Sequence, residues 1–124
     1  MVNLFVYGTL INDEVVKAVT GKTFSKAPAS LSGYFVAKLE NLKCPGLVVK
    51  PNASANGYIL KDVDEKSASL IDKWEDSRYS LGQVVTDDGT KCDTYLWTKD
   101  FMLEEWDNNQ FRNLHMSGYI NDLV

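Results

Sequence analysis

The chain has 124 residues, 44% hydrophobic and 24% charged, which is the size and composition of one globular domain with its own core. Its net charge is −4, and Lys and Arg are scattered singly, without the basic stripe that nucleic acid or an anionic membrane requires. The two cysteines, Cys44 and Cys92, are too far apart for a CxxC motif and too few for a disulfide-dense secreted scaffold. No stretch approaches the roughly 20 apolar residues of a spanning helix, and the first residues lack a signal peptide's basic segment. We expect a cytoplasmic protein without nucleic-acid or membrane partners, and its oligomeric state stays open.

The first elements are a buried strand and a short helix. Residues 3–7 form a continuous β-branched and aromatic run, typical of a strand covered on both faces, and Gly8 ends it. Asn12 and Asp13 are N-cap candidates for a short helix, and Gly21 is a natural stop.

The middle of the chain predicts more strands, with Gly33 marking a bulge or a close approach. A polar loop over residues 51–57 would separate the last two of them. The predicted strands are 31–38, 47–49 and 58–63.

The best-defined helix runs from residue 65 to about residue 76, with Asp64 as its cap. A hairpin follows over residues 79–97, closed around Asp87-Asp88-Gly89. A last helix is expected over residues 101–111, and residues 113–124 cannot be assigned. This order predicts one α+β domain over residues 1–124, with a mixed and strongly curled sheet.

The sequence lacks the residues that several common kinds of functional site require. The segment Thr20-Gly21-Lys22-Thr23 looks like the end of a phosphate-binding loop, but Val16 stands where that motif needs its first glycine. His115 is the one histidine, so neither a zinc site nor a catalytic triad is indicated. We interpret Asp87-Asp88 as turn residues and Glu104-Glu105 as charge at a helix N-terminus. We therefore expect no metal and no cofactor.

Glu75 is the residue that a purely structural helix does not explain. It follows Ile71 by one turn and neighbours Trp74, at the border of the apolar stripe. A carboxylate beside a packed indole loses solvation, which raises its pKa and suits it to general acid/base work. The alternative is a solvated rim carboxylate, or one paired with Arg78.

The turn Tyr7-Gly8-Thr9-Leu10 is the second candidate feature. Glycine lets a ligand approach the backbone closely, and N–H groups in such a turn can bind an anion or a polarised carbonyl. An ordinary strand-to-helix turn is the simpler interpretation.

Together, the motifs resemble the γ-glutamylcyclotransferase-like family, in particular its AIG2-like and γ-glutamylamine cyclotransferase branch. The resemblance runs in order from residue 4 to about residue 97. The segments that carry it are Leu4-Phe5-Val6-Tyr7-Gly8-Thr9-Leu10, Ala27-Pro28-Ala29-x-Leu31-x-Gly33-Tyr34, Cys44-Pro45-Gly46-Leu47-Val48, Gly57-Tyr58-Ile59-Leu60, Leu70-Ile71-Asp72-Lys73-Trp74-Glu75 with Tyr79, and Tyr95-Leu96-Trp97.

The resemblance implies a small mixed β-barrel flanked by helices. It implies Glu75 as the catalytic acid/base, with a substrate site formed by the Tyr7–Leu10 turn and Tyr79. The implied reaction releases 5-oxoproline and a free amine from a small γ-glutamyl compound, without metal or cofactor.

Three residues depart from the family's pattern. Asp76 stands where glycine is common, Leu81 where many members have a basic residue, and Ile71 where leucine is common. The first two put the leaving amine in doubt and leave two alternatives open. One is a related enzyme that removes a γ-glutamyl protecting group from a particular metabolite. The other is a non-catalytic module that keeps the pocket and binds a ligand or a protein.

Overall fold

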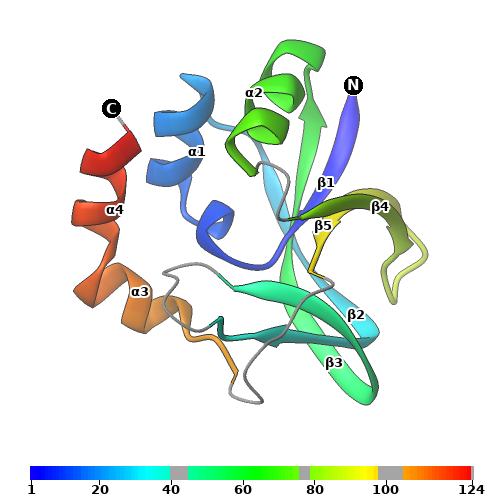
Figure 1. Ribbon diagram of the computed structural model, residues 1–124. Coiled ribbons are helices and arrows are strands. Elements are labelled where there is room, and N and C mark those ends of the chain that lie inside the picture. The colour runs from blue at the N-terminus through cyan, green and yellow to red at the C-terminus, as the bar shows by residue number, and fades with distance from the viewer. Residues whose placement is uncertain (40–44, 76–78, 98–104, 124) are drawn as a thin grey trace.

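The computed structural model describes residues 1–39, 45–75, 79–97 and 105–123. Its centre is a five-stranded sheet in the order β2–β3–β1–β5–β4 (Figure 1). Strand β1 is antiparallel to β3 and parallel to β5, so the sheet is mixed. Strand β3 also reaches β5, which curls the sheet into a half-barrel. The expected curled α+β architecture is thus confirmed. The strands are β1 Val2–Val6, β2 Lys26–Ala37, β3 Gly46–Val63, β4 Ser80–Val85 and β5 Lys91–Leu96.

Helices cover one face of the sheet, where α1 and α4 lie side by side and α2 packs against α1 (Figure 1). Helix α2 begins as predicted, because the Asp64 carboxylate accepts a hydrogen bond from the Ser67 N–H at 3.2 Å. Helix α1 ends at Gly21, whose φ of 82° is left-handed. The helical elements are η1 Thr9–Ile11, α1 Asp13–Thr20, α2 Glu65–Glu75, α3 Asn108–Leu114 and α4 Met116–Leu123.

The alternation of side chains along β1 divides the interior into two cores. Leu4 and Val6 face the helices and pack with residues such as Ile71 and Phe111. Phe5 and Tyr7 face the inside of the curl, with a different set of strand residues. The first strand is therefore covered on both faces, as its unbroken apolar run predicted.

The polar loop predicted over residues 51–57 is wrong. Residues 46–63 form one strand, β3, which pairs with β2 along its length. The irregularity predicted at Gly33 is present: Ser32 pairs with Ser54, while Tyr34 pairs with Val49, so β3 carries a bulge between them. Asn52 lies in this bulge at a φ of 69°. Turn-type residues thus occur inside a strand because the bulge needs them.

The predicted last helix is also partly wrong. Residues 101–104 lie outside the described residues, as do Cys44, Asp76 and Arg78. Glu105 forms an isolated bridge with Ala37 and is not helical. Helix α3 begins only at Asn108, because the Asp107 carboxylate caps it through the N–H groups of Asn109 and Gln110 at 2.8 and 3.3 Å.

Candidate functional site

The Tyr7–Leu10 turn follows directly from the central strand β1. Its glycine touches another segment so closely that a Cβ on Gly8 would lie 2.5 Å from Cγ of Pro45. The first hydrogen bond of η1 runs from the Ile11 N–H to the Gly8 carbonyl at 3.0 Å. The N–H groups of Thr9 and Leu10 precede this bond, so they have no acceptor within the helix.

The side chains of the turn point into the protein. The Tyr7 hydroxyl donates a hydrogen bond to the Tyr95 carbonyl at 2.6 Å, and its ring stacks on Phe5. Thr9 and Leu10 are buried as well. What this turn can present to a ligand is therefore its backbone.

Glu75 is the last residue of α2 and is half-buried. Its neighbour in space is Tyr95, whose hydroxyl donates a hydrogen bond to Asp72 at 3.1 Å. Burial raises the pKa of Tyr95, and the hydrogen bond to Asp72 and the charges of Asp72 and Glu75 raise it further. Tyr95 thus contacts Tyr7 through its carbonyl and the end of α2 through its side chain.

Tyr79 joins the same region through Pro45. Its hydroxyl donates a hydrogen bond to the Pro45 carbonyl at 2.9 Å, and its ring meets Trp97 edge-on at 5.2 Å. A Cβ on Gly46 would lie 2.5 Å from Cβ of Trp97, so that segment is also tightly held. The predicted segments around residues 7–10, 45–48 and 79 therefore meet at the end of β1. Leu81, the departure on β4, is exposed.

Sequence reasoning missed a group of polar residues behind the turn. Asn12 is only 2% exposed, and its side chain does not cap α1 although it stands at the N-cap position. It instead binds the Thr9 carbonyl and two residues of α3, Asn108 and Arg112. Because Asn108 and Arg112 lie 96 and 100 positions away from Asn12, no local pattern could have indicated them.

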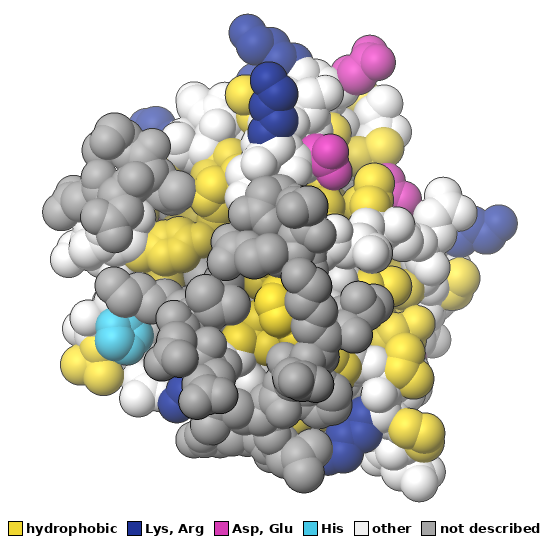
Figure 2. Space-filling view, in the orientation of Figure 1, with side chains coloured by type: hydrophobic (Ala, Val, Ile, Leu, Met, Phe, Trp, Pro, Cys, Tyr) yellow, Lys and Arg dark blue, Asp and Glu magenta, His cyan; other side chains and the backbone are white. Residues whose placement is uncertain are grey.

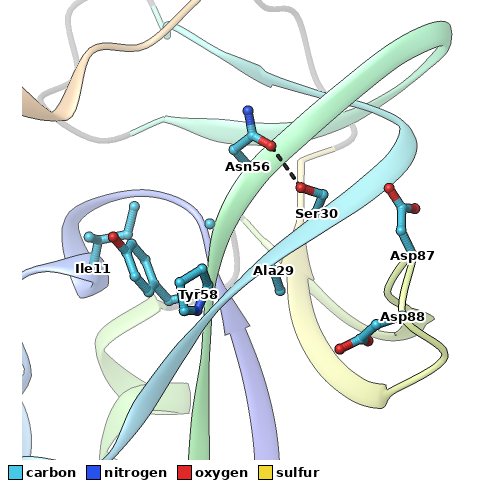
Figure 3. Close-up of a pocket in the computed structure, with 9 residues that line it drawn as sticks. Ile11, Ala29, Ser30, Asn56, Tyr58, Asp87 and Asp88 are labelled. Carbon is cyan, nitrogen blue, oxygen red and sulfur yellow. Dashed lines mark hydrogen bonds between the residues drawn. The ribbon is translucent and has the colours of Figure 1, made fainter.

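In the part of the chain that the structure describes, Ile11, which follows the turn, lines two cavities. The smaller, about 110 Å³, lies beside Tyr7 and is partly walled by Glu105, Trp106 and Asn108. The larger is a surface groove of about 540 Å³ between β2, β3 and the β4–β5 turn (Figure 3). In it, Ile11 and Tyr58 lie on one side and Asp87 and Asp88 on the other, with the Ser30–Asn56 hydrogen bond between them.

The acidic end of this groove is built by turn chemistry, as the sequence indicated. Asp87 accepts hydrogen bonds from the Ser32 N–H and hydroxyl at 2.9 and 3.0 Å. Asp88 accepts from the Thr86 hydroxyl and the Thr90 N–H, and these bonds hold the pKa of its carboxyl below the usual range. The Asp88 carboxylate therefore shapes the hairpin turn, whereas the Asp87 carboxylate ties that turn to Ser32 of β2.

Among the described residues, no group of three or more His, Cys, Asp or Glu side chains could hold a metal ion. None of the helices in that part of the chain is long and apolar enough to span a membrane. On the face shown in Figure 2, Lys and Arg side chains stand at several separate places. Cys92 is a buried free thiol, and burial raises its pKa.

Comparison with known proteins places the fold in the γ-glutamylcyclotransferase class. The model of the family described as γ-glutamyl cyclotransferase, AIG2-like, matches residues 4–117. The chain therefore belongs to this family, which confirms the resemblance carried by its motifs.

The relatives agree with this assignment. Protein AIG2 C of Arabidopsis thaliana is 30% identical over 126 residues, covering 95% of this chain and 76% of that protein. A solution structure of an Arabidopsis thaliana protein aligns with a TM-score of 0.72 at 27% identity, over 97% of this chain and 78% of the other. A solved γ-glutamyl cyclotransferase aligns with a TM-score of 0.58 at 15% identity, over 98% of this chain and 85% of the other, which shows the shared fold alone.

Proposed function

We propose that this protein releases 5-oxoproline and a free amine from a small γ-glutamyl compound, with Glu75 as the general acid/base. The observation that carries the proposal is the meeting of the family's motif segments at one end of β1. The Gly8 turn packs on Pro45, Pro45 binds Tyr79, and Tyr95 joins Tyr7 to the end of α2 that carries Glu75. These segments are distant in sequence, so their packing together supports a common site.

The proposed reaction begins with proton transfer. The α-ammonium of a γ-glutamyl group is not a nucleophile until it loses a proton, which the Glu75 carboxylate accepts. The free amine then attacks the γ-carbonyl carbon of the same molecule and closes a five-membered ring. The amine and the carbonyl belong to one substrate molecule. Holding that molecule in its folded conformation can therefore lower the activation barrier by about 7–11 kcal/mol.

Collapse of the tetrahedral intermediate completes the reaction. The bond between the γ-carbon and the leaving nitrogen breaks, and protonated Glu75 gives its proton to that nitrogen. The ring nitrogen gives its second proton to the departing amine, so the products are 5-oxoproline and an ammonium ion, and atoms and charge balance. The N–H groups of Thr9 and Leu10 are the donors proposed to bind the substrate's polar groups or the oxyanion.

The test is to incubate the purified protein with a panel of γ-glutamyl amines and peptides and to measure 5-oxoproline by mass spectrometry. Glu75→Gln should lower the rate by about 10²–10⁴-fold, the usual contribution of a general acid/base. Glu65→Gln is the matched control, because Glu65 is exposed in the first turn of the same helix. Its rate should equal that of the wild type.

The outcomes separate the alternatives. Equal release by Glu75→Gln and wild type, with both folded, would remove Glu75 from the mechanism. Absence of release from every substrate, combined with binding of 5-oxoproline, would favour the binding module. The best substrate in the panel would identify the leaving amine.

A further inference from the structure

Asn12 uses its whole hydrogen-bonding capacity between the turn and α3. Its Nδ2 donates to the Thr9 carbonyl and to Oδ1 of Asn108, both at 3.0 Å. Its Oδ1 accepts from Nδ2 of Asn108 at 3.3 Å and from Nη1 of Arg112 at 2.8 Å. An amide has two donors and two acceptor sites, so this buried side chain is fully satisfied.

Helix α3 is itself fixed to α1, close to its contact with Asn12. Arg112 forms a two-point ion pair with Glu14, at 3.2 Å from Nη1 and 2.8 Å from Nη2. This hydrogen bonding lowers the pKa of Glu14 to about 2. The preceding residue, Phe111, is 2% exposed in the core beneath the helices. The partners of Asn12 are therefore anchored and can hold its amide in one orientation.

The Thr9 carbonyl matters because of peptide geometry. The carbonyl of Thr9 and the N–H of Leu10 belong to one planar peptide group and point in opposite directions. Two donors hold this carbonyl, the Asn12 N–H at 3.1 Å and the Asn12 side-chain amide at 3.0 Å. Fixing the direction of the carbonyl therefore fixes the direction of the Leu10 N–H.

We propose that Asn12 is a positioning residue, which aims the Leu10 N–H of the substrate turn because α3 holds its amide against the Thr9 carbonyl. The inference rests on the proposed function, since that function makes the turn N–H groups substrate-binding. It also gives the C-terminal segment a role in the site. Without the Asn12 side-chain amide, the Thr9 carbonyl keeps only the hydrogen bond from the Asn12 backbone N–H, so the Thr9–Leu10 peptide group can tilt.

The decisive variant is Asn12→Asp. Its side chain has nearly the same shape and can still accept from Arg112, but it has no donor for the Thr9 carbonyl. We expect the Leu10 amide resonance to shift in NMR spectra while resonances across β3 and β5 stay in place. With L-5-oxoproline as the probe, Kd should rise by about tenfold or more, the effect of losing one well-placed hydrogen bond. With the best panel substrate, KM should rise similarly and kcat should change by less than about threefold.

Two further variants complete the experiment. Arg112→Lys loses the two-point geometry with Glu14 but keeps a cationic donor for Asn12, so it should bind 5-oxoproline more tightly than Arg112→Met, which has no donor. Lys22→Gln is the control, because it breaks a 3.1 Å ion pair with Asp64 beyond the other end of α1. If Asn12→Asp does not fold, the contrast between the two Arg112 variants carries the test.

The outcomes distinguish this inference from the proposed function. An unshifted Leu10 resonance in Asn12→Asp, or a Kd within twofold of the wild type, would overturn the positioning role. Wild-type protein that neither binds nor releases 5-oxoproline would instead contradict the proposed function. In that case the Leu10 resonance would still report whether Asn12 orients the turn.

Discussion

Gly8 shows how a single missing side chain lets two segments of the site meet. The distance from a Cβ placed on this glycine to the Pro45 ring is far below contact distance, and a proline ring cannot move aside as a long side chain can. Pro45 also accepts the hydrogen bond from Tyr79. A methyl group at Gly8 therefore disturbs three segments at once.

Gly8→Ala should lower stability by about 1–3 kcal/mol, the usual cost of overpacking, and should also weaken 5-oxoproline release. The measurement is urea unfolding followed by circular dichroism. Gly118→Ala is a matched control, because a Cβ there meets nothing within 4 Å and Gly118 lies in α4. Since alanine favours helix, this control should gain up to about 1 kcal/mol. Equal stability of Gly8→Ala and wild type would contradict the close contact.

The candidate site was predictable only where neighbours in sequence carry it. The Tyr7–Leu10 turn and Glu75 follow from motifs and from the position of a carboxylate on an apolar stripe. The contacts of Asn12 with Asn108 and Arg112 could not be predicted, because a polar residue before a helix is typical of a cap. Only tertiary packing reveals that its amide has turned elsewhere.

At the level of elements, β3 is the strand that gives the sheet its curl. It pairs with β2 and β1 and also touches β5 at Leu47. Its bulge around Asn52 changes the register against β2 and bends the strand between its two halves. The predicted break at residues 51–57 therefore marked a real irregularity, but tertiary pairing made one strand of it.

Substitutions at Asn52 should test this bulge, because its φ of 69° is a left-handed conformation that β-branched residues resist. Asn52→Val should cost about 1–2 kcal/mol, and Asn52→Gly should be neutral within about 0.5 kcal/mol. Ser54→Val, two residues on at an exposed position of the same strand, is the control and should cost less than about 0.5 kcal/mol. Thermal unfolding monitored by calorimetry gives all three values. If Asn52→Val were as stable as the control, the bulge would be contradicted.

The other helix boundaries were predictable wherever a capping residue marks them in the sequence. Asp64 begins α2 and Gly21 ends α1 at the expected places. The helix predicted over residues 101–111 has the wrong start because Asp107 is one of several polar residues there, and only the folded structure shows that it is the cap.

Across the whole molecule, the C-terminal helices pack against the segment that follows β1. Arg112 of α3 binds Glu14 of α1, and α4 lies along α1 (Figure 1). The ion pair joins residues that are 98 positions apart in the sequence. Its strength should therefore affect how the free energy of unfolding depends on pH.

The pKa of Glu14 is lowered from 4.5 to about 2, chiefly by the hydrogen bond from Arg112. Below pH 4.5 the unfolded chain takes up this proton before the folded chain does, so the stabilisation is complete above pH 4.5 and is lost as pH falls towards 2. Because the pair is half-exposed, its worth is about 0.5–1 kcal/mol. Glu14→Gln should be less stable than wild type by this amount at pH 7, and the difference should vanish near pH 2.

Urea unfolding of both proteins at several pH values measures this difference. Arg112→Gln should show the same reduced dependence on pH, since it returns Glu14 to an unpaired state. A constant gap between wild type and Glu14→Gln from neutral to acidic pH would contradict the lowered pKa.

The hydrogen bond from Arg112 to Asn12 also limits how early the turn can reach its final structure during synthesis. Its partners are 100 residues apart in sequence, and a ribosome adds roughly 5–20 residues per second, so Asn12 waits about 5–20 seconds for Arg112 to be made. During that interval the residues of β1 and α1 have already been synthesised, while the amide behind the turn has no partner from α3. The proposed substrate turn is therefore completed among the last steps of synthesis and folding. A nascent chain released early would carry Glu75 and the whole Tyr7–Leu10 motif, and still lack the contacts that hold the turn.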